Sequence, residues 1–158
     1  MSGNVEMVHV GSVSLLGCGD PVPQGSKRIG RAGKSRRPLL IDANAKTKPW
    51  RDELARAALE HFGTPELGDI RLTCTFYFTR PQSHYHKKFG GYTDLLKSSA
   101  PSFKKSKPDL DKLLRSVFDA LTGIAWRDDS QVVSVDAYKR WGVRGSVVLS
   151  VWRMEVGQ

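Results

Sequence analysis

Alternating apolar and polar positions predict five β-strands along the chain. The clearest case is 70–78, where Ile, Leu, Cys, Phe and Phe alternate with Arg, Thr, Thr and Tyr, as in a strand with one buried face. A short turn at 141–145 separates the last two predicted strands. The five strands are expected at 8–16, 38–42, 70–78, 131–138 and 146–153. Strands of this kind need a shared sheet and a layer that covers its apolar face.

Two segments have the spacing of amphipathic helices. In 49–62, Trp50 and Leu54 begin an apolar series at helical intervals, and Gly63 follows as a stop. In 110–121 the leucines, Val and Phe share one face, and the acidic residues around its start suit the positive N-terminal end of a helix.

The order β–loop–β–α–β–long loop–α–β–β predicts the α/β (α+β) class, with a mixed β-sheet covered by two helices. All of 1–158 is expected to form this single small domain, because neither a repeat nor a second domain is visible. Two basic segments, at about 19–37 and 81–107, lack a hydrophobic period and are expected to be mobile loops. Within the first, the Gly- and Pro-rich stretch 17–33 is expected to form no regular element.

The charge balance indicates a polyanionic partner. The chain has 25 Lys and Arg against 16 Asp and Glu, a formal net charge of +9 and a pI near 9.8. The alternative is a basic protein whose charge only keeps it soluble. The residues expected to contact DNA are Lys27, Arg28, Arg31, Lys34, Arg36, Arg37, Lys104, Lys105, Lys107 and Lys112.

Other features restrict the class of protein. No run approaches the roughly 20 apolar residues of a membrane span, and the first 16 residues do not resemble a signal peptide. Cys18 and Cys74 match no metal spacing and are expected to be reduced thiols, so a cytoplasmic protein without a membrane partner or an organic cofactor is predicted.

Acidic residues gather in one window of this basic chain. Asp109 and Asp111 stand at the start of the second predicted helix, and Asp128 and Asp129 precede a strand. If that strand ran beside the helix start, three carboxylates would converge, which is the oxygen-rich ligand set that Mg²⁺ prefers. The alternatives are an N-cap for the first pair and an ordinary turn for the second.

Cations near this window suit phosphate chemistry. Lys107, Lys112 and Arg115 are close enough in sequence to stabilise the charge of a pentavalent transition state. Asp119, four residues after Arg115, is expected to form an ion pair with it on the helix face.

Several of these motifs together resemble the RusA family of Holliday-junction resolvases, which is frequently phage-encoded. The resemblance is strongest over 107–139. It rests on Asp109–Leu113, Phe118–Thr122, Asp128–Val133, Lys139 and the segment Pro21–Arg28. Several spaced motifs in order are far more specific than one Asp-x-Asp pair.

The resemblance implies a homodimeric endonuclease that uses Mg²⁺ (or Mn²⁺) and cuts opposed strands of a four-way DNA junction in recombination or repair. It implies Asp109, Asp111 and Asp129 as metal ligands, with Asp128 in support. The family's catalytic lysine falls on Arg115, which keeps the charge but cannot donate a proton. Lys112 is a second departure, since many members have Asn there.

Aromatic residues and alternatives complete the set of expectations. Tyr85, Phe89 and Tyr92 lie in the second basic segment and are candidates for stacking on unpaired bases. Trp126, Trp141 and Trp152 are candidates for a dimer surface, with core packing as the commoner role. Two other functions remain open: a DNA-binding protein without catalysis on the same scaffold, and a metal nuclease that acts on other branched nucleic acids.

Overall fold

The computed structural model describes residues 4–25, 27–31, 38–42 and 44–157, with the backbone alone for 27–31 and 38–42. The strands are β1 (Val5–Leu16), β2 (Lys27–Arg31), β3 (Pro38–Asp42), β4 (Asp69–Thr79), β5 (Tyr85–Lys88), β6 (Gly91–Leu96), β7 (Val132–Gly142) and β8 (Ser146–Val156). The helices are α1 (Thr47–Leu59) and α2 (Leu110–Leu121), with short 3₁₀ turns η1 (Gln82–His84) and η2 (Asp129–Gln131).

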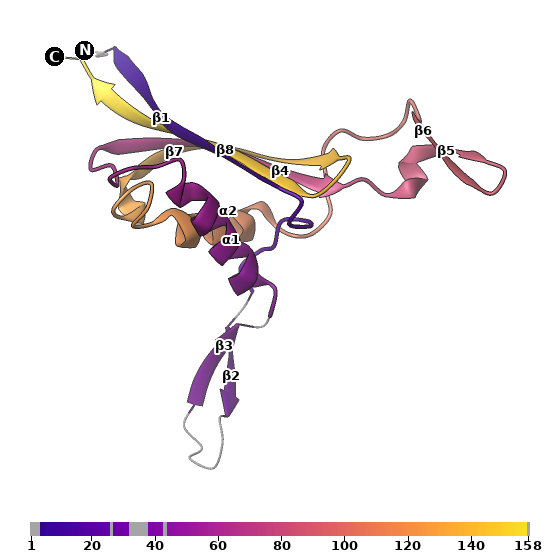
Figure 1. Cartoon of the computed structure of the whole chain (residues 1–158), viewed down its shortest axis with the longest axis horizontal. Coiled ribbons are helices and arrows are strands. Elements are labelled where there is room, and N and C mark those ends of the chain that lie inside the picture. Colours follow the sequence, from indigo (N-terminus) through magenta and orange to yellow (C-terminus); the bar gives the residue numbers. More distant parts are fainter. Residues whose placement is uncertain (1–3, 26, 32–37, 43, 158) are drawn as a thin grey trace.

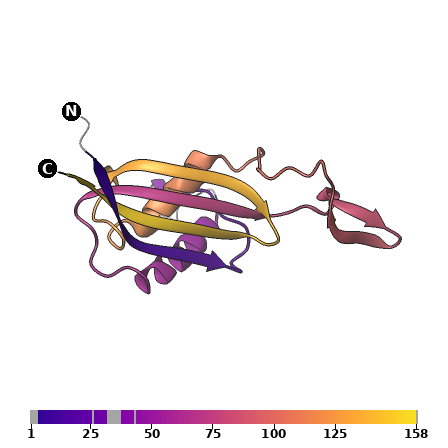
Figure 2. The ribbon, with the colours of Figure 1, turned by 90° about the horizontal axis from the view of Figure 1, so that it is seen from above.

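Four strands form a mixed sheet in the order β1-β8-β4-β7 (Figures 1 and 2). β8 pairs antiparallel with both β1 and β4, whereas β4 and β7 are parallel. A parallel pair requires a crossover, and the segment that contains α2 supplies it. The predicted mixed sheet with two helices in a single small domain is therefore confirmed.

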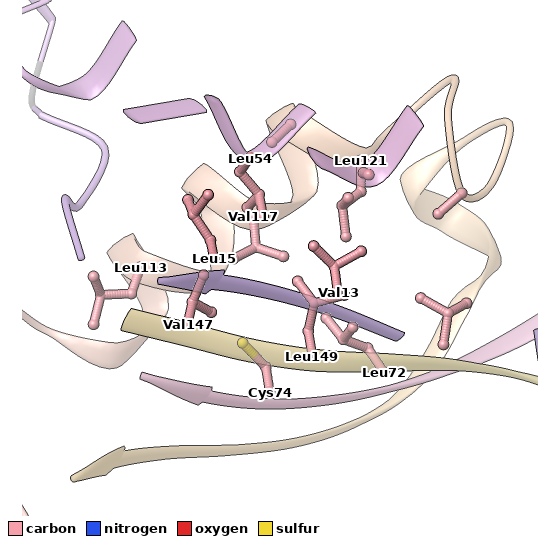
Figure 3. Packing of buried hydrophobic residues seen from close by; sticks show 14 of the residues in the cluster. Val13, Leu15, Leu54, Leu72, Cys74, Leu113, Val117, Leu121, Val147 and Leu149 are labelled. Carbon is pink, nitrogen blue, oxygen red and sulfur yellow. The ribbon is translucent and has the colours of Figure 1, made fainter. Parts of the chain in front are cut away.

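The two helices cover one face of this sheet (Figure 1). In β4, every second side chain from Ile70 to Phe78 is buried beneath them. Leu54 of α1 and Val117 of α2 pack into the same core, which Figure 3 shows from close by. The strong amphipathic spacing of α2 thus reflects burial of one face, and Trp126 beyond its end is also fully buried, as core packing predicts.

α2 runs antiparallel to β7, and this direction decides where the acidic residues lie. At the start of α2, the Lys139 ammonium of β7 donates to the carbonyl oxygen of Pro108 at 2.7 Å. At its end, Thr122 donates to Asp129, which immediately precedes β7. The beginning of β7 therefore lies beside the end of the helix, because a parallel crossover must return along the sheet.

Two hairpins project from the domain, and each corrects an expectation (Figure 1). The stretch 17–33 was expected to lack regular structure, but β2 forms within it and pairs antiparallel with β3. The segment 81–107 was expected to be a mobile loop, but it contains η1 and the hairpin β5–β6. Neither hairpin belongs to the main sheet, so alternation against a core is not required of its residues.

The described residues contain no helix long and apolar enough to cross a membrane. Cys18 and Cys74 are both free thiols, as expected. Burial raises the pKa of Cys74 far above its usual range, so this thiol is unreactive inside the core.

Candidate active site at the start of helix α2

The first turn of α2 presents two exposed carboxylates. Asp109 occupies the N-cap position with extended backbone angles (φ −72°, ψ 144°), yet its side chain makes no capping hydrogen bond. It is 3.5 Å from the Lys112 ammonium, and the Asp109 side chain is 51% exposed. Asp109 is therefore the N-cap residue of α2 by position, as one alternative expected, but its oxygens face solvent and one lysine instead of backbone N–H groups.

Asp111 lies in the same first turn and is also exposed. Among the described residues it has no hydrogen bond or ion pair. Arg115 lies one turn further along and is exposed as well. The predicted Arg115–Asp119 ion pair does not form: Asp119 instead accepts from Arg51 of α1 at 2.8 Å, because that face of α2 packs on α1.

Lys139 holds the segment that leads into Asp109. Its ammonium donates to the carbonyl oxygens of Ser106 at 3.0 Å and of Pro108 at 2.7 Å. The motif resemblance singled out Lys139 but gave it no role. Lys139 pairs with Phe76 of β4 in the strand register, and this position on β7 places its ammonium beside the segment that leads into α2. Such charge-assisted bonds are stronger than neutral ones, so they restrain the backbone that carries the carboxylates.

Lys104 belongs to the same ordered segment. Its ammonium lies 4.8 Å from the ring centre of Trp141 and 5.1 Å from that of Phe78, and it donates to Ser106 Oγ at 2.6 Å. Burial, followed by the charge of Lys139, lowers the pKa of Lys104. It is thus partly buried rather than part of a mobile arm, whereas Lys105 and Lys107 are exposed.

An open pocket with a volume of about 1000 Å³ adjoins Asp109. The start of α2, the segment before α1 and the Pro-rich stretch after β1 together form its walls. The charged side chains that line it are Asp20, Lys46, Glu53, Lys104, Lys107, Asp109 and Lys112. Four of these seven are lysines and three are carboxylates, so the charged lining has a formal net charge of +1.

Asp129 lies at the opposite end of α2. Its Oδ1 accepts from Trp126 Nε1 at 3.1 Å and from the Thr122 hydroxyl. Twelve helical residues separate the two ends, a length of about 18 Å. The expectation that Asp129 converges with Asp109 and Asp111 within one chain is therefore wrong, because β7 runs antiparallel to α2 and begins at the far end of the helix.

Asp128 forms a turn rather than a metal site. Its side chain accepts from the Ser130 amide at 2.8 Å, and Gln131 Oε1 accepts from the Asp128 amide at 2.9 Å, which makes a reciprocal capping box around η2. Gln131 also donates to Glu66 and Gly68 at 2.9 Å each. The Asp128–Gln131 motif thus connects this turn to the segment before β4, as the ordinary-turn alternative predicted.

The remaining basic residues that were expected to contact DNA fall within 27–37 of the sequence. Lys27, Arg28 and Arg31 belong to β2, of which the backbone alone is described. The other three, Lys34, Arg36 and Arg37, lie outside the described residues. Their roles remain predictions. The hairpin emerges from the pocket wall, since the amide of Gln24 donates to the carbonyl oxygen of Lys112 on α2 at 3.0 Å.

The donor set at the start of α2 fits a hard divalent cation. Mg²⁺ keeps several waters and is commonly bound by one or two carboxylates together with substrate phosphates. Asp109 and Asp111 supply two such carboxylates without competing capping bonds. No group of three or more potential ligands from His, Cys, Asp or Glu occurs in the described part of the chain. A single chain therefore offers a two-carboxylate site.

The fold and this site define a small basic α+β domain with paired acidic residues beside a large open pocket that four lysines line. A family model described as endodeoxyribonuclease RusA matches residues 19–151, more than four-fifths of the chain. The chain belongs to the RusA family of endodeoxyribonucleases, hydrolases that act on branched DNA junctions. No curated protein matches the chain.

Proposed function

We propose that the protein resolves four-way DNA junctions by paired, symmetric and Mg²⁺-dependent cleavage of two opposed strands. The observation that carries the proposal is the pair of exposed carboxylates, Asp109 and Asp111, beside a lysine-lined pocket in a chain of the RusA family. A basic protein that exposes two acidic side chains next to a site for phosphate weakens its own binding to DNA, even though Lys112 lies 3.5 Å from Asp109. A divalent cation held by Asp109 and Asp111 would remove this conflict, because it would supply positive charge beside the phosphate.

Asp109 and Asp111 would hold Mg²⁺, and Mn²⁺ is expected to substitute. The bound ion would polarise the scissile phosphate and lower the pKa of a water nucleophile. Lys107 and Lys112 would hold the flanking phosphates, because both line the pocket beside Asp109. Arg115, one turn along the same exposed face, would stabilise the negative charge that develops on the phosphate oxygens.

A dimer would bring the distant Asp129 into use. β7 is an edge strand, and Val133 and Val135 on it are 58% and 37% exposed. An exposed apolar edge strand favours pairing with another chain. A two-fold axis that set two β7 edges side by side would also set the two α2 helices antiparallel. Asp109 and Asp111 of one chain would then face Asp129 of the second copy, and each dimer would contain two such sites.

The first experiment compares cleavage of an immobile four-way junction with cleavage of the matching linear duplex, in Mg²⁺ and in EDTA. Symmetric nicks on opposed strands, with metal and on the junction alone, are expected. Tight binding to the junction without cutting in any divalent metal would instead identify a binding protein without catalysis. Cutting of flaps or forks in preference to the four-way junction would identify a nuclease for other branched DNA.

A mixing experiment tests the shared site. Asp111→Asn and Asp129→Asn are each expected to abolish cleavage as separate dimers. In a mixed dimer with shared sites, one site carries both substitutions and the other carries none, so mixing the two inactive proteins restores nicking of one strand. If each site belonged to a single chain, both sites of the mixed dimer would carry one substitution, and no activity would return.

A further inference from the structure

The hairpin β5–β6 forms an arm that extends beyond the end of the sheet (Figures 1 and 2). Lys88 pairs with Gly91, so Phe89 and Gly90 form a two-residue turn at its tip. Gly90 has φ of 78°, a left-handed conformation that glycine adopts without steric cost, and this permits the tight turn. Phe89, which precedes Gly90, therefore lies at the tip of the arm.

Phe89 is fully exposed, with a relative exposure of 107%, the largest of the exposed hydrophobic side chains of the described residues. Leaving a phenylalanine in water forgoes the stabilisation that burial of its ring would give. Single exposed apolar residues are common on protein surfaces. The Phe89 ring, however, stands at the tip of a projecting hairpin, where its full exposure means that it does not serve packing within the described chain. Its flat apolar face is available to a planar ligand.

The sides of the arm are basic and carry further aromatic groups. Lys87 and Lys88 are exposed immediately before the tip, and Tyr92 is paired with Lys87 across the hairpin. Asp94 is the arm's single acidic residue within β5 and β6. An apolar ring between two lysines and a tyrosine matches a nucleic acid strand, which offers a base to the ring and phosphates to the ammonium groups.

The base of the arm is attached to the same structure that supports the active site. Arg80 donates to the carbonyl oxygen of Pro101 at 2.8 Å, which closes the base of the excursion. The His84 ring packs edge-on against Trp141 at a centroid distance of 5.4 Å. The Lys104 ammonium lies over the ring of the same Trp141 and donates to the hydroxyl of Ser106. Lys139 in turn donates to the carbonyl oxygen of Ser106. The arm is therefore fixed in position relative to the start of α2 and does not hang on a free linker.

We infer that Phe89 is a wedge that stacks on an unpaired nucleobase at the branch point, while Lys87 and Lys88 hold the adjoining phosphates. This inference rests on the proposed junction substrate and gives it a recognition element separate from the carboxylates. Duplex DNA exposes no base faces along its length, whereas a branch point exposes them where the stacked arms separate. The wedge therefore supplies a preference for branched DNA that the basic surfaces alone do not provide.

The test measures permanganate oxidation of thymines at the branch of an immobile junction, in EDTA and at saturating protein. The unmodified chain is expected to increase oxidation, because unstacked thymines react. Phe89→Ala is expected to return it to the level of free DNA and to weaken junction binding roughly tenfold, with duplex binding unchanged. Phe89→Trp should restore both properties, since its larger ring also stacks.

Leu95→Ala is the matched control, because Leu95 is 67% exposed on the same arm but lies away from the turn. It is expected to leave both oxidation and affinity unchanged. Retention of full oxidation by Phe89→Ala would overturn the wedge, as would an equal loss of junction and duplex binding. Opening of the branch in EDTA by a chain that cuts in no metal would support the wedge and refute the proposed nuclease activity.

Discussion

At the first turn of α2, Asp109 and Asp111 leave their carboxylates exposed, whereas beyond its last turn Asp128 and Asp129 accept hydrogen bonds from neighbouring groups. Both pairs look alike in the sequence. The difference lies in what surrounds them: a lysine-lined pocket at one end and an indole, a hydroxyl and a capping box at the other. Within one chain, the available hydrogen-bond donors thus decide whether an acidic side chain stays exposed or joins a local hydrogen-bond network.

The largest expected effect comes from the open end of the helix. Asp111→Asn should reduce junction cleavage by about three orders of magnitude. It removes a proposed ligand of the metal ion, and the ion would stabilise the charge of the transition state by several kcal/mol. Junction affinity in EDTA and the melting temperature should not fall, since Asp111 is exposed and forms no hydrogen bond or ion pair with the other described residues. The control is Asp52→Asn, which changes an exposed carboxylate of α1 that pairs with Lys48. Equal cleavage by both variants would remove Asp111 from the site.

Lys139 of β7 connects the sheet to the segment before Asp109, and its substitution should have the next largest effect on cleavage. Lys139→Met removes two charge-assisted hydrogen bonds to the backbone before Asp109, so cleavage is expected to fall by about one to two orders of magnitude. Lys139→Arg keeps a donor and should recover part of the rate. Single-turnover cleavage measures this effect at saturating protein, where a loss of affinity has no influence. An unchanged rate in Lys139→Met would mean that the segment needs no such restraint.

Substitution of Arg115 tests whether a positive charge near Asp109 and Asp111 speeds cleavage, and a smaller effect on the rate is expected. Arg115→Gln should slow cleavage by about tenfold, because an exposed cation stabilises phosphate charge only partly in water. Arg115→Lys should retain most of the rate, since the charge is kept. A slower Arg115→Lys with an unchanged affinity would show that the planar guanidinium geometry matters. Lys48→Gln on α1 controls for the loss of one surface charge.

Most of the fold was predictable because burial leaves a periodic signal. The predicted helix 110–121 coincides with α2, and β4 extends its predicted strand by one residue at each end. The predicted strand 38–42 coincides with β3, although β3 lies outside the main sheet. The hairpin strands β2, β5 and β6 gave no such signal, since none of them belongs to the main sheet or covers a core.

The site was predicted in part for a related reason. The acidic pair at the start of α2 follows from local sequence, whereas the separation of Asp129 depends on the direction of α2 relative to β7. That direction is set by the parallel pairing of β4 with β7, a contact between segments more than 60 residues apart. No local pattern contains it. The Lys139 contacts with Ser106 and Pro108 depend on the same pairing and were missed for the same reason.

The smallest expected effect on activity belongs to Asp128, whose carboxylate caps η2. Asp128→Ala removes the cap of η2 and should lower the melting temperature by a few degrees, while cleavage below that temperature stays within about threefold. Hydrogen bonds from Ser130 lower the pKa of Asp128, so the folded chain binds its proton less readily than the unfolded chain does. The stabilisation is therefore present above the usual carboxyl pKa and is lost as the pH falls through the lowered value. Thermal denaturation of both proteins across the acid range measures this, and the two melting curves should converge at low pH. A large loss of cleavage with an unchanged melting temperature would place Asp128 with the catalytic carboxylates and remove the distinction between the two ends of α2.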